Sequence, residues 1–201
     1  EAATAGVRWI LGPVLDLHQM HADAVRSPII ANRAFGGEVQ RVLECGGAFL
    51  RGIADAGGIS CGKHFPGHGN CGQDSHTELA VCFDDPAIHL EPFQTLLPQM
   101  PSIMVGHIEY PLLDPEGKHA SRSKVLMDIL RKDWNYDGVV VTDSIRMLGF
   151  GDGPQEELAV ESIHAGVDLL LDPADPVALA ITLRDAADRG DLDEERVFEA
   201  V

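Results

Sequence analysis

The densest group of potentially reactive side chains lies in the segment KHFPGHGNCGQDSH, which covers residues 63–76. Its glycines and its proline indicate a loop that follows a strand. A histidine titrates near neutral pH and can donate a proton and later recover it. A carboxylate two residues away can orient the ring and raise its basicity. Asp74 and His76 meet this requirement and predict an acid–base pair. The segment also holds Lys63, His64 and His68.

A second candidate lies in the stretch GVVVTDS, residues 138–144. A buried strand that ends in a carboxylate holds that carboxylate rigidly, as a nucleophile requires. Asp143 is the residue in this position. An aspartate here can equally cap a following helix, and its position in the sequence leaves both interpretations open.

The histidine loop also offers metal ligands, because imidazole nitrogens and carboxylate oxygens bind zinc and related ions. The spacing of the candidates matches neither the helical HExxH pair nor a zinc-ribbon pattern. We therefore expect no metal and keep a metal-dependent hydrolase as an alternative. The sequence contains no Rossmann or Walker glycine pattern, so we also expect no organic cofactor. The four candidate ligands are His64, His68, Asp74 and His76.

Short apolar runs recur along the chain, and their uniformly apolar character is typical of strands that are covered on both faces of a parallel sheet. Helix-like stretches alternate with them, which predicts a (β/α) architecture. Ser123 is placed to cap one helix and Gly166 to end another. The expected strands are Val7–Leu17, Ile59–Phe65, Ser102–Ile108, Gly138–Thr142 and Val167–Leu171, and the expected helices are Gly37–Ala56, Ser123–Asp133, Glu156–Ala165 and Pro176–Ala187.

Polar residues follow these strands at their carboxyl ends, where both barrels and open sheets build their sites. They are Asp16, Lys63 with His64, His107, Asp143 and Asp172. A complete barrel takes about 250 residues. We therefore expect residues 1–201 to form part of a (β/α)8 TIM-type barrel that lacks its first strands. The opening residues Glu1–Gly6 and the closing DLDEERVFEAV are both expected to be helical.

Several motifs together resemble family 3 glycoside hydrolases, specifically their bacterial β-N-acetylglucosaminidase branch. KHFPGHG and DSH are followed in order by HIEYPLLD and YDGVVVTDSIRM. The resemblance extends from PVLDL at residues 13–17, through NRAFG at 32–36, to AGVDLLL at 165–171, and so covers nearly the whole chain. KHFPGHG with a trailing DSH is highly specific, because glucosidase members of the family lack that histidine loop.

The resemblance implies roles for individual residues. Asp143 matches the nucleophile, His76 the acid/base residue and Asp74 its paired aspartate, in a retaining hydrolysis of β-linked N-acetylglucosaminides. The resemblance also implies a carbohydrate partner, a catalytic barrel domain over residues 1–201, and a cytoplasmic role in cell-wall recycling. Three further residues match those that hold sugar hydroxyls in such enzymes: Arg33, Lys63 and His64.

The chain departs from the family pattern in three places. Ser144 stands where the family usually has a second acidic residue, the stretch His18–Ser27 is longer than the usual connection, and the early DQEGG-type segment is absent. A non-catalytic sugar-binding protein and a β-glucosidase of the same family therefore remain alternatives.

Composition narrows the range of partners. The net charge is −17, from 15 Lys and Arg against 32 Asp and Glu, which opposes nucleic-acid binding. No apolar run is long enough to span a membrane. The four cysteines form no CxxC pair, and we expect free thiols in a reducing compartment.

Overall fold

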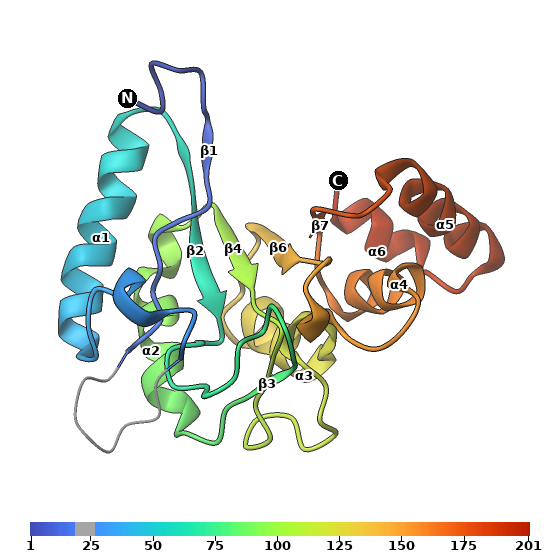
Figure 1. Ribbon diagram of the computed structural model, residues 1–201. Coiled ribbons are helices and arrows are strands. Elements are labelled where there is room, and N and C mark those ends of the chain that lie inside the picture. Colours follow the sequence, from blue (N-terminus) through green and yellow to red (C-terminus); the bar gives the residue numbers. More distant parts are fainter. Residues whose placement is uncertain (19–26) are drawn as a thin grey trace.

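A computed structural model describes residues 1–18 and 27–201, so most of the long connection expected between His18 and Ser27 lies outside the described residues. A five-stranded parallel sheet forms the centre of the molecule, with the strand order β1-β2-β4-β6-β7 (Figure 1). A second sheet pairs β3 with β5 in parallel. The strands are β1 Trp9–Ile10, β2 Ile59–Phe65, β3 Ala80–Val81, β4 Ser102–Val105, β5 Ile108–Glu109, β6 Val139–Ser144 and β7 Leu169–Leu171.

The strands agree with the sequence patterns, with two corrections. In the run predicted over Val7–Leu17, regular strand pairing ends at Ile10. Pro13 has no N–H to donate, and pairing resumes only as an isolated bridge between Val14 and Lys63. The run predicted over Ser102–Ile108 is divided. Its first part is β4, and Ile108 begins β5 in the other sheet.

The four predicted helices are present as α1, α3, α4 and α5, and α6 forms in the closing segment. Ser123 caps α3 by accepting from the N–H of Leu126, and α4 ends before Gly166, as predicted. We did not predict α2, although Asp85 caps it through the N–H of Ala87. The helices are α1 Val39–Asp55, α2 Pro86–Leu96, α3 Lys124–Asp128 (continued by a π-helical turn, Ile129–Asp133), α4 Gln155–Ala165, α5 Pro176–Arg189 and α6 Glu194–Glu199.

The helix expected over Glu1–Gly6 is wrong. The Ala5 N–H bonds to the Glu1 carbonyl at 3.0 Å, but Gly6 has φ +84°, which turns the chain out of the helix after a single turn. In the described ranges, no helix is both long enough and apolar enough to cross a membrane.

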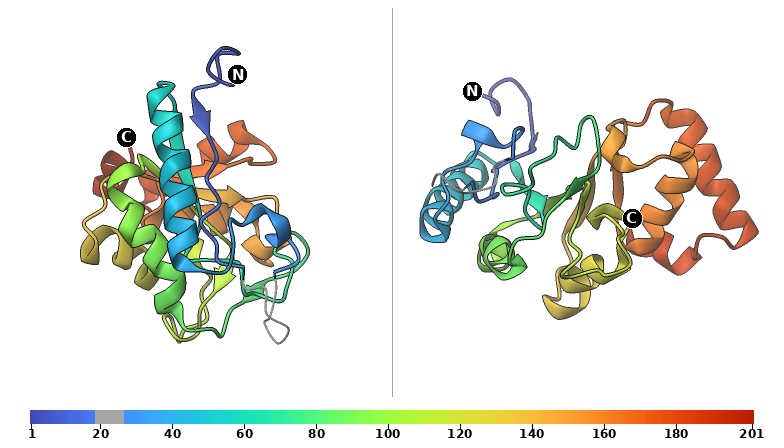
Figure 2. Two further views of the ribbon diagram at one scale, coloured as in Figure 1. Left: turned by 90° about the vertical axis from the view of Figure 1, so that its left-hand side faces the viewer. Right: turned by 60° about the horizontal axis from the view of Figure 1, so that its bottom comes forward.

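The sheet is curled, and the helices lie along its outer side (Figure 2). The described strands therefore form a parallel half-barrel with β1 and β7 at its edges, which is consistent with the expected part of a TIM-type barrel, although a full barrel is not formed by these residues. Side chains alternate between the two faces. Ile103, Val105 and Val140 belong to the large core shared with the helices, whereas Met104 and Val141 form a smaller layer on the other face.

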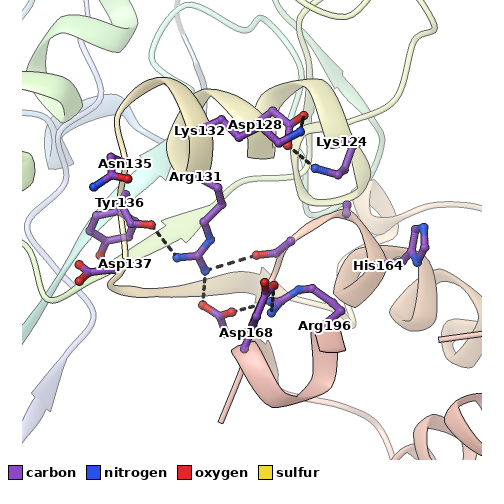
Figure 3. Close-up of a pocket in the computed structure, with 13 residues that line it drawn as sticks. Lys124, Asp128, Arg131, Lys132, Asn135, Tyr136, Asp137, His164, Asp168 and Arg196 are labelled. Carbon is purple, nitrogen blue, oxygen red and sulfur yellow. Dashed lines mark hydrogen bonds and ion pairs between the residues drawn. The ribbon is translucent and has the colours of Figure 1, made fainter. Parts of the chain in front are cut away.

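A network of charged residues lies where β6 and β7 begin, at the amino-terminal end of the sheet (Figure 3). The Asp168 carboxylate forms ion pairs with Arg131 and Arg196, and one of its oxygens accepts from the N–H of Val140 at 2.8 Å. Asp168 thereby joins the segment after α3, the start of both strands, and α6. Asp168, Arg131 and Arg196 are among the residues that line a cavity of about 570 Å³. Their pairing leaves the mostly buried Asp168 carboxylate with no uncompensated charge, which would be strongly destabilising.

Candidate active site

Three side chains from different strand ends meet at the carboxyl-terminal end of the sheet. Asp16 follows the bridge at Val14, His64 lies within β2, and Asp143 lies near the end of β6. His64 Nδ1 is 2.7 Å from Asp16 Oδ2, and His64 Nε2 is 3.8 Å from Asp143 Oδ2. Because a carboxylate has no hydrogen to donate, His64 carries a hydrogen on Nδ1, and Nε2 faces Asp143 and the open side of the site.

Asp16 is fully buried and holds two histidines through its two oxygens. Oδ2 accepts from the backbone N–H and the ring of His64, and Oδ1 accepts from the backbone N–H of His68 at 2.5 Å. Burial raises the pKa of Asp16, but the charge of His64 and these hydrogen bonds outweigh it, and the pKa lies below its usual value. The carboxylate is therefore ionised at neutral pH. We gave Asp16 no role from the sequence, although it follows a strand in the same pattern as Asp143.

Asp143 is ionised and partly open to solvent. Its side chain is 22% exposed, and Oδ1 accepts from the N–H of Ser144 at 2.8 Å. Burial raises its pKa, but the charge of His64, the Ser144 hydrogen bond and the charge of Lys63 outweigh burial, so the net shift is downward. The interpretation of Asp143 as a helix cap is wrong, because the next α-helix begins only at Gln155. Asp143 is thus a fixed, ionised carboxylate at the mouth of the sheet.

The sequence placed three histidines and Lys63 on one loop, and the structure corrects this. Lys63 and His64 lie inside β2, and His68 is buried just after it. His68 Nε2 lies 2.9 Å from Ser75 Oγ, and burial lowers the pKa of His68 to about 4 against the opposing charge of Asp16. His68 is therefore neutral and connects the buried cluster to the loop that carries Asp74 and His76.

Asp74 and His76 form the pair that their spacing predicted. One oxygen, Asp74 Oδ1, accepts from the backbone N–H of His76 at 2.9 Å and from its ring Nδ1 at 2.8 Å. The His76 hydrogen bonds hold the pKa of Asp74 below its usual value. Nδ1 of His76 therefore carries a hydrogen, and Nε2 is the nitrogen left to exchange a proton. The side chains are 37% and 58% exposed, in contrast to the buried His64 and Asp16.

The loop with this pair is hydrogen-bonded to the segment that follows β6, the strand that carries Asp143. The N–H of Leu148 donates to the His76 carbonyl at 3.3 Å, and the N–H of Gly149 donates to the Ser75 carbonyl at 3.0 Å. The backbones approach so closely that a Cβ on Gly149 would lie 2.6 Å from the Ser75 carbonyl oxygen. The loop and the strand that carries Asp143 are thus held at the same end of the sheet.

The sugar-binding candidates occupy different environments. His64 is buried beside Asp143, and the charge of Lys63 acts on the Asp143 carboxylate. Arg33 is exposed on the 3-10 helix Ala31–Arg33, where its Nε donates to the Ile29 carbonyl at 3.0 Å. The structure therefore brings Lys63 and His64 near Asp143, whereas Arg33 is not part of the buried cluster.

A second histidine pair supports the backbone around Asp143, and we assigned it no role from the sequence. His107 Nε2 is 3.1 Å from the Ser144 carbonyl, and its Nδ1 is 3.0 Å from Ser121 Oγ. His119 lies against the same hydroxyl and against the Phe150 carbonyl, at 3.0 and 2.7 Å. Burial lowers the pKa of His107 to about 4 and that of His119 to about 3. Both rings are neutral and contact the carbonyls of Ser144 and Phe150, which lie on either side of the residues that bind the loop, Leu148 and Gly149.

The four candidate metal ligands do not assemble. His64 and His68 are occupied by Asp16 and Ser75, and the exposed Asp74–His76 pair is a separate unit. Within residues 1–18 and 27–201, no group of three or more His, Cys, Asp or Glu side chains is placed to hold a metal ion. The metal-dependent alternative thus lacks a ligand cluster in this part of the chain.

Comparison with known proteins agrees with this geometry. Residues 1–201 match the profile of the glycosyl hydrolase family 3 N-terminal domain. A curated β-hexosaminidase from Pseudomonas aeruginosa (strain LESB58) is 38% identical over 155 residues, which are 74% of this chain and 44% of that protein. The chain therefore spans less than half the length of this relative.

Solved structures give the same result. The β-N-acetylglucosaminidase of family 3 from Paenibacillus sp. FPU-7 matches 99% of this chain and 39% of its own, with a TM-score of 0.90 and 30% identity. A β-glucoside phosphorylase, BglX, matches all of this chain and 38% of its own, with a TM-score of 0.88 and 27% identity. Proteins with different named activities thus share this fold.

The buried neutral histidines make stability depend on pH. An unfolded histidine titrates near pH 6.5, whereas His107 and His119 titrate near 4 and 3 in the folded chain. Between these values the unfolded state binds more protons, so the free energy of unfolding falls as the pH drops through this window and is retained above it. We expect a loss of roughly 1–2 kcal/mol per histidine from pH 7.5 to pH 5, measured by urea denaturation.

The matched variants are His119→Gln, which removes one titrating ring from the interior, and His164→Gln, which removes an exposed one. The first should lose less stability than the parent between the two pH values, and the second should lose as much. An equal loss in both variants would contradict the assignment.

The close contact at Gly149 makes a second prediction. A methyl group there must displace the loop, because the contact is with backbone oxygens of Ser75 and Glu78. We expect Gly149→Ala to lower the free energy of unfolding by about 1–3 kcal/mol, the usual cost of overpacking, and to speed amide hydrogen exchange at Ser75 and His76. Gly52→Ala, in an exposed part of α1 with no atom within 4 Å of the new Cβ, should be neutral or slightly stabilising. Unchanged exchange in Gly149→Ala would show that the loop is not docked through this contact.

Proposed function

The chain belongs to glycosyl hydrolase family 3, and from this premise we propose that its protein removes terminal β-linked N-acetylglucosamine residues with retention of configuration. The proposal rests chiefly on one observation. The loop of the Asp74–His76 pair is hydrogen-bonded through its backbone to the segment that follows Asp143, so a hydrogen-bonded imidazole–carboxylate pair and an ionised carboxylate lie at one end of the sheet.

Asp143 serves as the nucleophile in this proposal. Its carboxylate attacks the anomeric carbon and forms a covalent glycosyl-enzyme, as retaining enzymes do. The hydrogen bond from Ser144 and the charges of His64 and Lys63 keep it ionised. His64, fixed by Asp16, turns Nε2 toward the sugar and, together with Lys63 and Arg33, binds sugar hydroxyls.

His76 serves as the general acid and then as the general base. In the first step Nε2–H protonates the leaving oxygen, and in the second the neutral ring takes a proton from the water that releases the sugar. Asp74 holds Nδ1 and stabilises the imidazolium each time it forms. Retaining enzymes usually employ two carboxylates about 5–5.5 Å apart. An imidazole on a loop replaces the second carboxylate here and brings no second negative charge beside Asp143.

This difference in charge also supports a second acceptor. A neutral imidazole does not repel an anion, so phosphate can approach the glycosyl-enzyme where a carboxylate base would oppose it. The similarity to a protein named as a β-glucoside phosphorylase points to the same alternative. We rank hydrolysis first, because the curated relative carries the name β-hexosaminidase.

The biological setting proposed with this activity is cell-wall recycling in the cytoplasm. The natural substrate would then be an N-acetylglucosaminide released from peptidoglycan. Release of N-acetylglucosamine from such fragments by the full-length protein would support this setting.

The residue roles are tested on the full-length protein with an aryl β-N-acetylglucosaminide. We expect Asp143→Ala and His76→Ala to lose nearly all turnover, and Asp74→Asn to lose about 10²–10⁴-fold, the usual scale of acid–base assistance. His164→Ala, an exposed histidine remote from the site, is the control. Proton NMR should show the β-anomer as the first product. An α-anomer, or full activity in either alanine variant, would refute the mechanism.

Substrate class and acceptor are tested by paired comparisons. We expect kcat/KM for the aryl N-acetylglucosaminide to exceed that for the aryl glucoside by at least about tenfold, since a pocket that hydrogen-bonds an amide discriminates strongly against its absence. The reverse preference would assign the protein to the glucosidases. Addition of inorganic phosphate should leave free sugar as the main product, and sugar 1-phosphate in its place would establish phosphorolysis.

A further inference from the structure

Two buried cysteines meet at the base of the loop that carries the acid–base pair. Cys71 and Cys82 are both 0% exposed and form one apolar cluster with Ala80, Ile108 and Tyr110. Their side chains lie close enough for each thiol to change the acidity of the other. The chain between them, residues 72–81, contains Asp74 and His76, so the two sulfur atoms mark the point where this loop leaves the body of the protein and returns to it.

Cys71 and Cys82 have unequal acidities. The interaction with Cys71 lowers the pKa of Cys82, and burial opposes this without reversing it. The same interaction, together with burial, raises the pKa of Cys71. One sulfur is thus favoured as the thiolate and the other as the thiol. By contrast, burial raises the pKa of Cys61, within β2, to about 11. Thiol oxidation requires a thiolate and, for a disulfide, a neighbouring thiol.

Each cysteine of the pair is buried but is adjacent in the sequence to an exposed residue. Gly72, next to Cys71, is exposed, and Phe83, next to Cys82, is 74% exposed. The chain before Cys82 is held by the pairing of the two-residue strands β3 and β5. The N–H of Cys82 extends this ladder by donating to the Glu109 carbonyl at 2.9 Å. A local opening of this short ladder, without unfolding of the main sheet, is enough to admit a small oxidant.

We propose that Cys71 and Cys82 are a redox modification site and form a reversible disulfide that clamps the base of the acid–base loop. With a peroxide as oxidant, the Cys82 thiolate attacks one peroxide oxygen, the O–O bond breaks, and a sulfenic acid and hydroxide form. The Cys71 sulfur then attacks the Cys82 sulfur, the S–O bond breaks, and water leaves. Two thiols are oxidised and one hydrogen peroxide is reduced to two waters. A dithiol reductant reverses the change.

The disulfide alters the loop more than the core. An S–S bond of ~2.05 Å links two side chains of the same buried cluster, and it closes residues 71–82 into a ring. The loop then loses part of its freedom to leave its docked position against Leu148 and Gly149. The clamp also slows turnover, because the loop must open to exchange substrate and product. This consequence alone rests on the proposed function.

The first test maps the disulfide in the full-length protein carrying Cys45→Ser, which removes the half-buried thiol on α1. After treatment with hydrogen peroxide, non-reducing peptide mapping should give the Cys71–Cys82 linkage in at least about tenfold excess over any linkage to Cys61. Cys61→Ser should leave its yield unchanged, and Cys71→Ser should instead leave Cys82 as a trappable sulfenic acid. Oxidation of other thiols with Cys71 and Cys82 still free would overturn the proposal.

The second test measures the clamp without reference to activity. Glu78 is exposed within the loop. Cleavage after it by a glutamate-specific protease, followed on reducing gels, should be slower in the oxidised protein by about tenfold, and a dithiol should restore the rate. Equal cleavage rates in both states would overturn the clamp.

Turnover of the aryl N-acetylglucosaminide is then compared in the same samples. Lower kcat on oxidation, recovered with the dithiol and absent in Cys71→Ser, completes the proposal. If the reduced protein has no turnover while the linkage and the slower cleavage are present, the proposed function fails and the redox site stands.

Discussion

The arrangement of the site depends on the buried carboxylate of Asp16. Its two oxygens hold the chain on both sides of the turn after β2, through the ring and N–H of His64 and the N–H of His68. A buried carboxylate without such partners would be strongly unfavourable, so the three groups require one another. Because Asp16 occupies Nδ1 of His64, the other nitrogen is directed to Asp143. The Asp16–His64 interaction thus has two effects. It lowers the pKa of Asp16, and it orients the His64 ring beside Asp143.

The two halves of the site differ in rigidity. Asp143 and His64 are held by strands whose side chains are buried on both faces, whereas Asp74 and His76 are exposed and bonded mainly to each other. The exposed half is positioned through backbone contacts, from Gly149 to the Ser75 carbonyl and from Leu148 to the His76 carbonyl. A few backbone hydrogen bonds are easily broken and remade, so this half can move while Asp143 stays in place.

Stabilising charges and reactive charges are separated along the sheet. At the amino-terminal end, Asp168 is neutralised by Arg131 and Arg196 and braces the strands. At the carboxyl-terminal end, the ionised Asp143 is beside histidines that burial keeps neutral, such as His68 and His107. Neutral rings give hydrogen bonds without adding fixed positive charge next to the carboxylate. His68 and His107 therefore place no positive charge beside the Asp143 carboxylate.

The sequence by itself determined the central strands, most of the helices and the Asp74–His76 pair. Uniform apolar runs located the central strands, Ser123 and Gly166 marked helix ends, and the spacing of Asp74 and His76 predicted a pair that the structure contains. These are local features, fixed by residue type and short separations. Only the tertiary structure decided that His64 and His68 are buried and bound to Asp16, that Arg33 is not part of this buried cluster, and that Gly149 holds the loop. Such contacts join residues far apart in the chain, and whether they form depends on how the strands curl and which backbones approach, which no local pattern encodes.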